Sequence, residues 1–374
     1  MEFGRIMFLA ILGFAAPSAT RSSSEMIYFQ SIEKDVSVGR VNDLFVSDDG
    51  KRFAYTQEIT SPPLEADQSQ KTRLPSDQMA TLVMGEVGRK SVPRTIANVS
   101  GKTQVLFMGP NACFYSSDLD ATVVTENGPL NVPQDGWKDP WLRPKLAFHD
   151  ASNLLLVGFE MPDSFEIDPP VRGSLVRFGL SDFKRKSTAA KDLWNFDAGS
   201  IVALRISPSG SEASYLTATR HRRISRDLSE PDWDFQINAL QTSDGERQWS
   251  RDLPSNLFSV SRISSFENDR VTILGMMSVK GKLLPTVLDS TTRGVREWRP
   301  DPGVILDHAE DRALVHTDAR ELLIVKTRDG SRMPVCGSFD SKSGMKAVLS
   351  SNGRHVFMLS EMKKELELRI FSLN

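Results

Sequence analysis

The sequence has few of the residues that build metal centres and disulfide frameworks. Its 374 residues include only two cysteines and five histidines, and these are scattered singly along the chain. A protein metal site needs several convergent donors. The sequence also has no Gly-x-Ser-x-Gly nucleophile elbow, the signature of the α/β-hydrolases. We therefore expect no metal site, no cofactor and no hydrolase domain of that class.

A strong excess of charge of either sign is also missing. The formal net charge is -2, with 39% hydrophobic and 25% charged residues. This balance is typical of a folded globular chain and not of a disordered one. A protein that binds nucleic acid usually carries a broad basic surface. The composition gives no reason to expect a nucleic-acid partner.

The only notable apolar run lies at the amino terminus. Arg5 precedes an apolar stretch over residues 6–16, and the small residues of Pro17-Ser18-Ala19 follow it. This order is typical of a secretory signal, and the run is too short to span a bilayer. We expect residues 1–19 to be a signal peptide, with the mature protein secreted or periplasmic and without a transmembrane segment. The alternative is an uncleaved amphipathic leader.

Seven copies of one unit fill the rest of the chain. Each copy has an apolar stretch, a tight polar turn and a second apolar strand, most clearly in Val41–Tyr55, Ile201–Tyr215 and Met345–Leu359. The last turn residues of the copies are Gly50, Asn111, Ser152, Gly210, Asp269, Asp311 and Gly353. Three of the six spacings between neighbouring copies are 41 or 42 residues, as from Asp311 to Gly353. A period of about 40 to 45 residues is that of a four-stranded propeller blade.

The repeat predicts an all-β fold, a single seven-bladed β-propeller over residues 26–374, which we expect to be a monomer. The last copy supplies only three strands, because the strand that begins at Glu365 ends the chain. The segment Met26–Val38 has strand-like alternation. We expect this N-terminal strand to pair with the final one, completing the last blade and closing the ring. The alternative is a loosely attached arm. Trp249 and Trp298 end two further strands, and we expect them to pack between blades.

The longer copies place their extra residues between the second and third strands. These segments are Gln57–Asp77, Glu160–Gly173 and Thr217–Asp234. In a propeller, all connections of this type emerge on one face, and long loops on a rigid scaffold often carry binding residues. This face is therefore the candidate binding site.

The loop that follows Thr217 is basic and contains Arg220, Arg222 and Arg223. Guanidinium groups suit carboxylates, so these arginines could grip an anionic group of a partner. Trp137, Trp141 and Trp233 would then supply flat apolar contacts. The alternative is structural, because the loop Glu160–Gly173 is acidic and could pair with the basic loop.

Other polar residues are expected to have structural roles. Cys113 and Cys336 fall in copies that are not neighbours in a ring of seven, so we expect two separate, largely buried thiols. We place His149 and His308 in tight turns, where a histidine usually hydrogen-bonds the turn. Five aspartates could bind a cation only if they faced the central channel, and their expected position in turns argues against this. They are Asp43, Asp48, Asp49, Asp307 and Asp311.

The turn units resemble those of a known repeat family. SDDGKRFAY, SPSGSEASY and SSNGRHVFM are similar to the Ser-Pro-Asp-Gly repeat of the TolB-like, WD40-like β-propellers, which also occurs in the propeller domains of prolyl oligopeptidases. A weaker likeness, in INALQTSDGERQW, is to quinoprotein-type propeller repeats. The proline is retained only in the copy at Ser207–Gly210, so the likeness concerns the fold more than the ligand.

The resemblance implies an exported propeller that acts as a docking platform. Our first hypothesis is a noncatalytic scaffold that binds a protein or peptide through the long-loop side. The alternative is a propeller-type lyase or glycan hydrolase that uses Asp or Glu residues on that side, and a third possibility is a purely structural envelope component. One fold hosts many functions, so the repeat alone does not choose among them.

Overall fold

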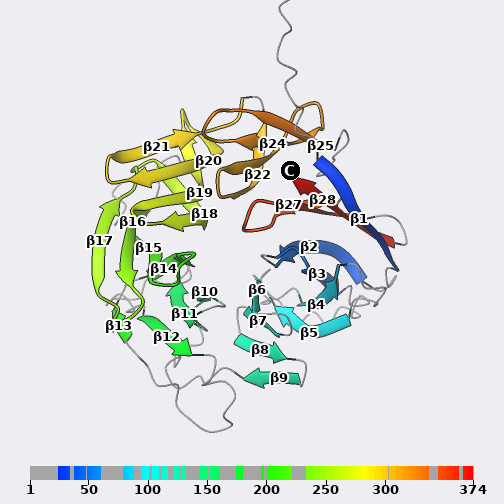
Figure 1. The fold of residues 1–374 in the computed structure, drawn as a ribbon, viewed down its shortest axis with the longest axis horizontal. Helices are drawn as coiled ribbons and strands as arrows, with labels where there is room; N and C mark the ends of the chain where they lie inside the picture. Colours follow the sequence, from blue (N-terminus) through cyan, green and yellow to red (C-terminus); the bar gives the residue numbers. More distant parts are fainter. Residues whose placement is uncertain are drawn as a thin grey trace, which may run out of the picture.

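The structure is a computed structural model that consists of β-strands and their connections. It describes residues 24–33, 38–47, 49–59, 79–87, 94–100, 103–108, 112–116, 121–125, 128–131, 143–149, 152, 154–160, 174–179, 195–197, 200–220, 233–301, 303–336, 344–361 and 365–373. Within these residues the strands form seven four-stranded antiparallel sheets, which we number I to VII. Figure 1 shows them arranged around a common centre. The fold is an all-β β-propeller, as the repeat predicts.

The strands of each sheet are consecutive in the chain, except in sheet VII. Sheet I contains β2 (Val38–Val46), β3 (Arg52–Ile59), β4 (Met79–Glu86) and β5 (Arg94–Ser100). Sheet II contains β6 (Gln104–Met108), β7 (Ala112–Ser116), β8 (Ala121–Thr125) and β9 (Gly128–Asn131). Sheet III contains β10 (Arg143–His149), β11 (Leu154–Glu160), β12 (Ser174–Gly179) and β13 (Asn195–Asp197). Sheet IV contains β14 (Ser200–Ile206), β15 (Glu212–Arg220), β16 (Trp233–Gln241) and β17 (Arg247–Asp252).

The remaining sheets complete the ring. Sheet V contains β18 (Leu257–Glu267), β19 (Arg270–Val279), β20 (Lys282–Thr291) and β21 (Gly294–Trp298). Sheet VI contains β22 (Val304–Ala309), β23 (Arg312–His316), β24 (Leu322–Lys326) and β25 (Arg332–Cys336). Sheet VII contains β26 (Lys346–Leu349), β27 (His355–Glu361), β28 (Glu365–Leu373) and β1 (Ser24–Glu33). In sheets I to VI the first strand in chain order lies nearest the centre in Figure 1.

The ring is closed by the N-terminal strand, as the sequence predicts. β1 pairs antiparallel with β28, from Ser24 opposite Leu373 to Glu33 opposite Glu365. The Ser24 hydroxyl also donates a 2.8 Å hydrogen bond to the carbonyl of Pro334, which lies on β25 of the neighbouring sheet VI. Chain segments from the two ends of the sequence therefore share one sheet, and this pairing ties the beginning of the chain to its end.

Hydrophobic side chains fill the spaces between neighbouring sheets. Phe53 and Tyr55 of sheet I pack with Phe357 and Leu368 of sheet VII in one core cluster. Similar clusters join sheets I and II, III and IV, IV and V, V and VI, and VI and VII. Burying one such side chain contributes about 1.5–3 kcal/mol. Most of the stabilising apolar burial thus lies between blades.

The two tryptophans singled out in the sequence lie in these interfaces. Trp249 of β17 packs against the cluster between sheets IV and V and meets Phe266 edge-on, with ring centroids 6.5 Å apart. Trp298 of β21 packs against the cluster between sheets V and VI. Their expected role in packing between blades is confirmed.

The glycine at the end of the clearest turn units is required by the backbone. Gly210 has a φ of 75°, and its amide donates a 2.9 Å hydrogen bond to the carbonyl of Ser207. A Cβ atom at Gly210 would lie 2.5 Å from Nδ1 of His149, on sheet III. The imidazole Nε2 of His149 lies 2.9 Å from the carbonyl oxygen of Pro208. The turn therefore uses glycine both for its conformation and for close contact with the preceding blade.

Four residues expected in turns are instead part of strands. His308 pairs with Ala313 and Ala309 pairs with Arg312, so the turn between β22 and β23 consists only of Glu310 and Asp311. Glu310 adopts the positive φ, 54°, that glycine supplies elsewhere. This turn is shorter than the turn at Ser207–Gly210, so Asp307 and His308 belong to strand β22. Asp43 likewise lies in β2, and His149 is the last residue of β10, where it pairs with Leu154. The prediction that these residues occupy turns was wrong.

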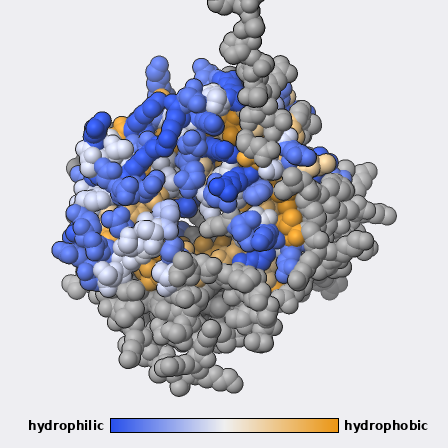
Figure 2. Space-filling model, viewed as in Figure 1, coloured by the Kyte–Doolittle hydropathy of each residue, from blue (hydrophilic) through white to orange (hydrophobic). Residues whose placement is uncertain are grey.

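The described surface on one face of the ring is mostly hydrophilic. Figure 2 shows hydrophilic side chains over much of the described surface on one face of the ring, with a hollow at the centre. No helix among the described residues has both the length and the apolar character needed to cross a bilayer. The segment 1–19, expected to be a signal peptide, lies outside the described residues.

Candidate functional site on the long-loop face

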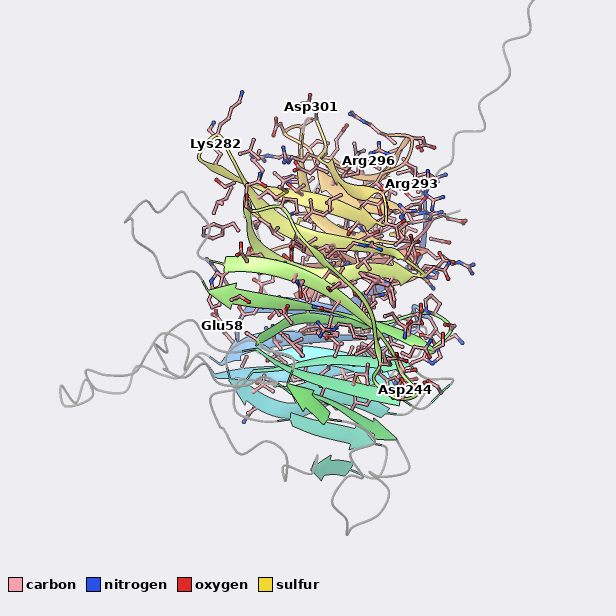
Figure 3. All side chains as sticks on the ribbon, turned by 90° about the vertical axis from the view of Figure 1, so that its left-hand side faces the viewer. Glu58, Asp244, Lys282, Arg293, Arg296 and Asp301 are labelled. Atoms are coloured by element: carbon pink, nitrogen blue, oxygen red, sulfur yellow. The ribbon has the colours of Figure 1, made fainter. Side chains whose placement is uncertain are left out.

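Connections between second and third strands emerge on one side of the ring, which we call the long-loop face. In Figure 3, Glu58 at the end of β3 and Lys282 at the start of β20 lie on this side. Asp244 and Arg293, in turns between third and fourth strands, lie on the opposite side. The expected separation of the two kinds of connection is therefore present.

The basic loop begins and ends on one long hairpin. β15 and β16 pair from Glu212 opposite Gln241 to Arg220 opposite Trp233. The chain between residues 220 and 233 thus leaves from and returns to adjacent strand ends on the long-loop face. Trp233 is half-buried and packs against the core cluster between sheets IV and V. This packing fixes the base of the loop.

The other predicted site residues cannot be placed relative to this hairpin. Arg222, Arg223, Trp137 and Trp141 lie outside the described residues, as does the acidic segment 161–173. For Arg220, the structure gives the position of the backbone at the end of β15. Of the six predicted residues, the structure therefore brings together only the backbone of Arg220 and Trp233, and the full constellation stays a prediction.

The sequence interpretation missed a feature of the same face. Among the described residues, four large hydrophobic side chains are exposed, and three of them lie at this edge of sheets V and VI. Leu283 is 45% exposed, Leu284 37% and Val304 47%; the fourth is Met26 of β1. The signal in the sequence is Lys-Gly-Lys-Leu-Leu at residues 280–284, where two leucines directly follow a glycine turn.

Charged residues of the inner strands join three sheets. Arg262 of β18 forms an ion pair with Asp307 of β22 and donates a hydrogen bond to the carbonyl of His308. Asp307 also accepts hydrogen bonds of 2.8 Å from the amide of Leu349 on β26 and of 2.9 Å from that of His308. Burial raises the pKa of Asp307, against the opposing effects of Arg262 and the two amides. These partners make Asp307 a link between sheets V, VI and VII.

His308 belongs to the same buried network. Its side chain is fully buried, and Nδ1 lies 2.8 Å from the hydroxyl of Ser264 on β18. The other ring nitrogen, Nε2, is buried without a hydrogen-bond partner. Burial, with the nearby charges of Arg262 and Arg270, lowers the pKa of His308 to about 3. The imidazole is therefore neutral at physiological pH, and its hydrogen bond with Ser264 links sheet VI to sheet V.

The remaining candidate aspartates are also accounted for locally. Asp43 lies near Lys346 and accepts a 3.4 Å hydrogen bond from Thr56, and partial desolvation by its surroundings raises its pKa. Asp49 accepts hydrogen bonds from Ser47 and from the amide of Lys51, at 2.7 and 3.0 Å, which stabilise its turn. Asp48 lies outside the described residues. In the part of the chain that the structure describes, no three His, Cys, Asp or Glu side chains form a group able to hold a metal ion.

The structure describes the side chain of one of the two cysteines. Cys336 is a half-buried thiol at the end of β25. Cys113 lies on β7 of sheet II, and the structure describes its backbone only. The expectation of two separate thiols therefore remains a prediction.

Comparison with known proteins identifies the fold. No protein-family model matches the sequence, and no curated protein matches it. The WD40 domain of Pan2 from Neurospora crassa is similar, with a TM-score of 0.53 at 8% identity over 94% of this chain and 96% of that one. Hydrazine synthase from Kuenenia stuttgartiensis has a TM-score of 0.53 at 9% identity, over 90% and 96% of the chains.

A third similar structure is an oligogalacturonate lyase from Vibrio parahaemolyticus. Its TM-score is 0.50 at 10% identity, over 94% of this chain and 99% of that one. The three proteins differ in what they do, while their identity to this chain is at most 10%. One architecture hosts unrelated functions. These likenesses therefore establish a β-propeller related in architecture to WD40 domains, and they establish the fold alone.

Proposed function

We propose that this protein is an exported, noncatalytic scaffold, a seven-bladed β-propeller that binds a protein or peptide through its long-loop face. The observation that supports this most is the hairpin of β15 and β16. Its nine residue pairs and the packing of Trp233 hold the two ends of a basic loop on a rigid base. Binding residues are often carried by loops whose ends are held on a rigid scaffold.

The basic loop supplies the chemistry of the proposed contact. Arg220, Arg222 and Arg223 would bind carboxylates of the partner, and Trp137, Trp141 and Trp233 would cover its apolar side chains. The acidic loop of the preceding blade is the competing partner for these arginines. An external ligand must compete with that acidic loop for the arginines, and its ionic contacts should weaken as salt increases.

Crosslinking tests the proposed surface. The native gene, with its leader, is expressed in its source organism, and crosslinked partners of wild type are compared with those of Arg222→Ala combined with Arg223→Ala. The matched control is Arg293→Ala combined with Arg296→Ala, because both arginines are exposed on sheet V and Arg293 lies on the opposite side. We expect the first pair to lose partners that the control retains. An unchanged partner set in the first pair would count against the basic loop.

Two further measurements test the other parts of the proposal. Amino-terminal sequencing of the mature protein should show cleavage after residue 19, and an intact leader in the cytoplasm would contradict export. The alternative function, a lyase or glycan hydrolase, is tested by incubating the protein with acidic polysaccharides and following new reducing ends and unsaturated uronates. Product formation that survives purification to homogeneity would replace the scaffold proposal.

A further inference from the structure

The outer wall of sheet VII is formed by the N-terminal strand. β1 lies on the peripheral side of β28 in Figure 1, and within the described residues β28 is the only strand that pairs with it. The outer edge of β1 therefore carries backbone N–H and C=O groups that no described strand meets. On such an edge every second residue directs both groups outward, where another strand can bond to them.

β1 is longer than the outer strands of the other six sheets. It has 10 residues, whereas β5, β9, β13, β17, β21 and β25 have 7, 4, 3, 6, 5 and 5. Short edge strands are one way in which proteins prevent pairing between edges. Sheet VII lacks this protection, because its outer strand pairs along the whole of β28.

β1 also lacks the residues that protect the other edges. Its residues 26–32 are uncharged, contain no proline and are mostly apolar or aromatic, a composition that favours pairing with a further strand. Among the described residues, Met26 in this run is the most exposed of the four exposed large hydrophobic side chains, at 54%. Each of the other outer strands carries an arginine or a proline, except β13, which has only three residues. These arginines and prolines are Arg94, Pro129, Arg247, Arg251, Arg296, Arg332 and Pro334.

The edge is held in a fixed position. The pairing of β1 with β28 is continuous from Tyr28 to Glu33, and its one irregularity lies just before Tyr28. At the start of the strand, the Ser24 hydroxyl donates a 2.8 Å hydrogen bond to the carbonyl of Pro334 on sheet VI. A strand that is already ordered loses little conformational entropy when another strand pairs with its outer side.

We propose that two copies of this protein pair through β1, antiparallel about a twofold axis at Gln30, so that sheet VII of each copy continues into that of the other. This register pairs residues 28–32 of one copy with the same residues of the second, and it sets Glu33 opposite Ile27. No two carboxylates are then directly opposite, a placement that would weaken the pairing.

A second copy is the occupant that the edge fits best. It carries the same unprotected strand with the same regular stretch, and a twofold axis makes one edge complementary to itself. Because the other outer strands are short or protected, the assembly ends at two copies. The pairing replaces the monomer expected from the sequence. It uses the outer wall of the ring and not the basic loop, so it goes beyond the proposed function and does not depend on it.

Sedimentation velocity tests the pairing, with protein expressed from the full gene. A single pair of strands is a small interface, so we expect a reversible dimer with a Kd of about 1–100 µM. Hydrogen exchange measured on the same samples should show slower exchange of the amides in residues 24–33 at the higher concentrations. A dimer that leaves the exchange of β1 unchanged would overturn the inference, as would a protein that stays monomeric throughout this range.

Charge changes at the twofold axis test the register. Gln30→Lys and Gln30→Glu each place like charges directly opposite one another, and each should raise the Kd about fivefold. An equal mixture of the two variants should dimerise to within about twofold of wild type, because a lysine then meets a glutamate. This recovery also shows that both variants are folded. A mixture no better than its components would overturn the inference.

A matched control separates the edge from general changes in surface charge. Gln248→Lys makes the same substitution at an exposed residue of β17, another outer strand. Its Kd should stay within about twofold of wild type, as expected for a surface position outside the contact. Equal effects of Gln248→Lys and Gln30→Lys would contradict pairing through β1.

Other occupants of the edge give distinct results. A purified monomer that loses a crosslinked cellular partner on Gln30→Lys would assign the edge to a strand of another protein. Polymers larger than a dimer would show that a second edge takes part. Either result overturns the inference. The Arg222→Ala, Arg223→Ala protein should dimerise as wild type does. Loss of its cellular partners without any dimer in wild type would leave the scaffold proposal standing and this inference wrong, and a dimer with an unchanged partner set would give the reverse.

Discussion

Acidification should loosen the joint between sheets V and VI, because His308 must be neutral there. The imidazole is fully buried, is 2.8 Å from Ser264 and has Arg262 bonded to its backbone carbonyl. A proton on Nε2 would place a second positive charge beside this guanidinium without a hydrogen-bond acceptor. We propose His308→Gln as the perturbation, because glutamine retains a polar group that can reach Ser264 and cannot be protonated in this range.

The size of the effect follows from the shift in pKa. The pKa of His308 falls from 6.5 in the unfolded chain to about 3 in the folded protein. Between these values the unfolded state binds more protons, so stability is complete above pH 6.5 and is lost as the pH falls toward 3. From pH 7.5 to pH 5, the loss from this one group is about 2 kcal/mol. The raised pKa of Asp307 acts in the opposite sense, since that carboxyl takes up a proton more readily in the folded state.

The assay is urea denaturation of wild type and variant at pH 7.5, 6.5, 5.5 and 5. At pH 7.5 the variant should be the less stable protein, by about 1 kcal/mol for the altered hydrogen bond. The difference should shrink and reverse toward pH 5, because only wild type loses stability through His308. Hydrogen exchange should show faster opening of β18 and β22 in wild-type acid samples. A stability difference that does not change with pH would refute the reasoning, and His149→Gln controls for loss of a histidine elsewhere.

Three further outcomes follow from the packing. Deleting residues 24–33 should lower the free energy of unfolding by several kcal/mol, seen in urea titrations, because it removes a whole strand of sheet VII; unchanged stability would show that the ring does not need β1. Asp307→Asn should lower the free energy of unfolding by about 2–4 kcal/mol, since Arg262 loses its counter-charge. The double variant Arg262→Leu, Asp307→Leu should recover part of this loss in the same urea titrations. Gly210→Ala should cost more than Gly330→Ala by about 1–3 kcal/mol in thermal or urea unfolding. Both glycines have φ near 70°, but only Gly210 faces a neighbouring side chain, so equal costs would contradict a role for that contact.

The positions of the turns were predictable where the repeat keeps its full length. Gly50, Gly210 and Gly353 all adopt positive φ, as their place in the repeat requires. The turn between β22 and β23 has only two residues and uses Glu310 for the same conformation. A count of residues from neighbouring copies therefore misplaced Asp307 and His308, because the strand register depends on backbone pairing and not on composition.

The candidate site was predictable in its location more than in its content. Loop length in the sequence was enough to choose the face, and the strand ends of β15 and β16 fit that choice. The exposure of Leu283 and Leu284 was not predictable, because Lys282–Thr291 also has the composition of an ordinary buried strand. Whether a leucine is covered depends on how far the adjacent strand β21 extends, and that is a property of the assembled sheet.

The sequence by itself determined the repeated strand-turn-strand unit, and with it the β-propeller and the need for a strand from the other end of the chain. These follow from local rules, since alternation, turn residues and period act within a few neighbouring residues. The tertiary structure decided which polar groups meet. Arg262, Asp307 and Leu349 lie on three sheets and are far apart in the chain. Their contact requires that the blades pack in a ring, and the low polarity of that packed interior also sets the pKa of His308.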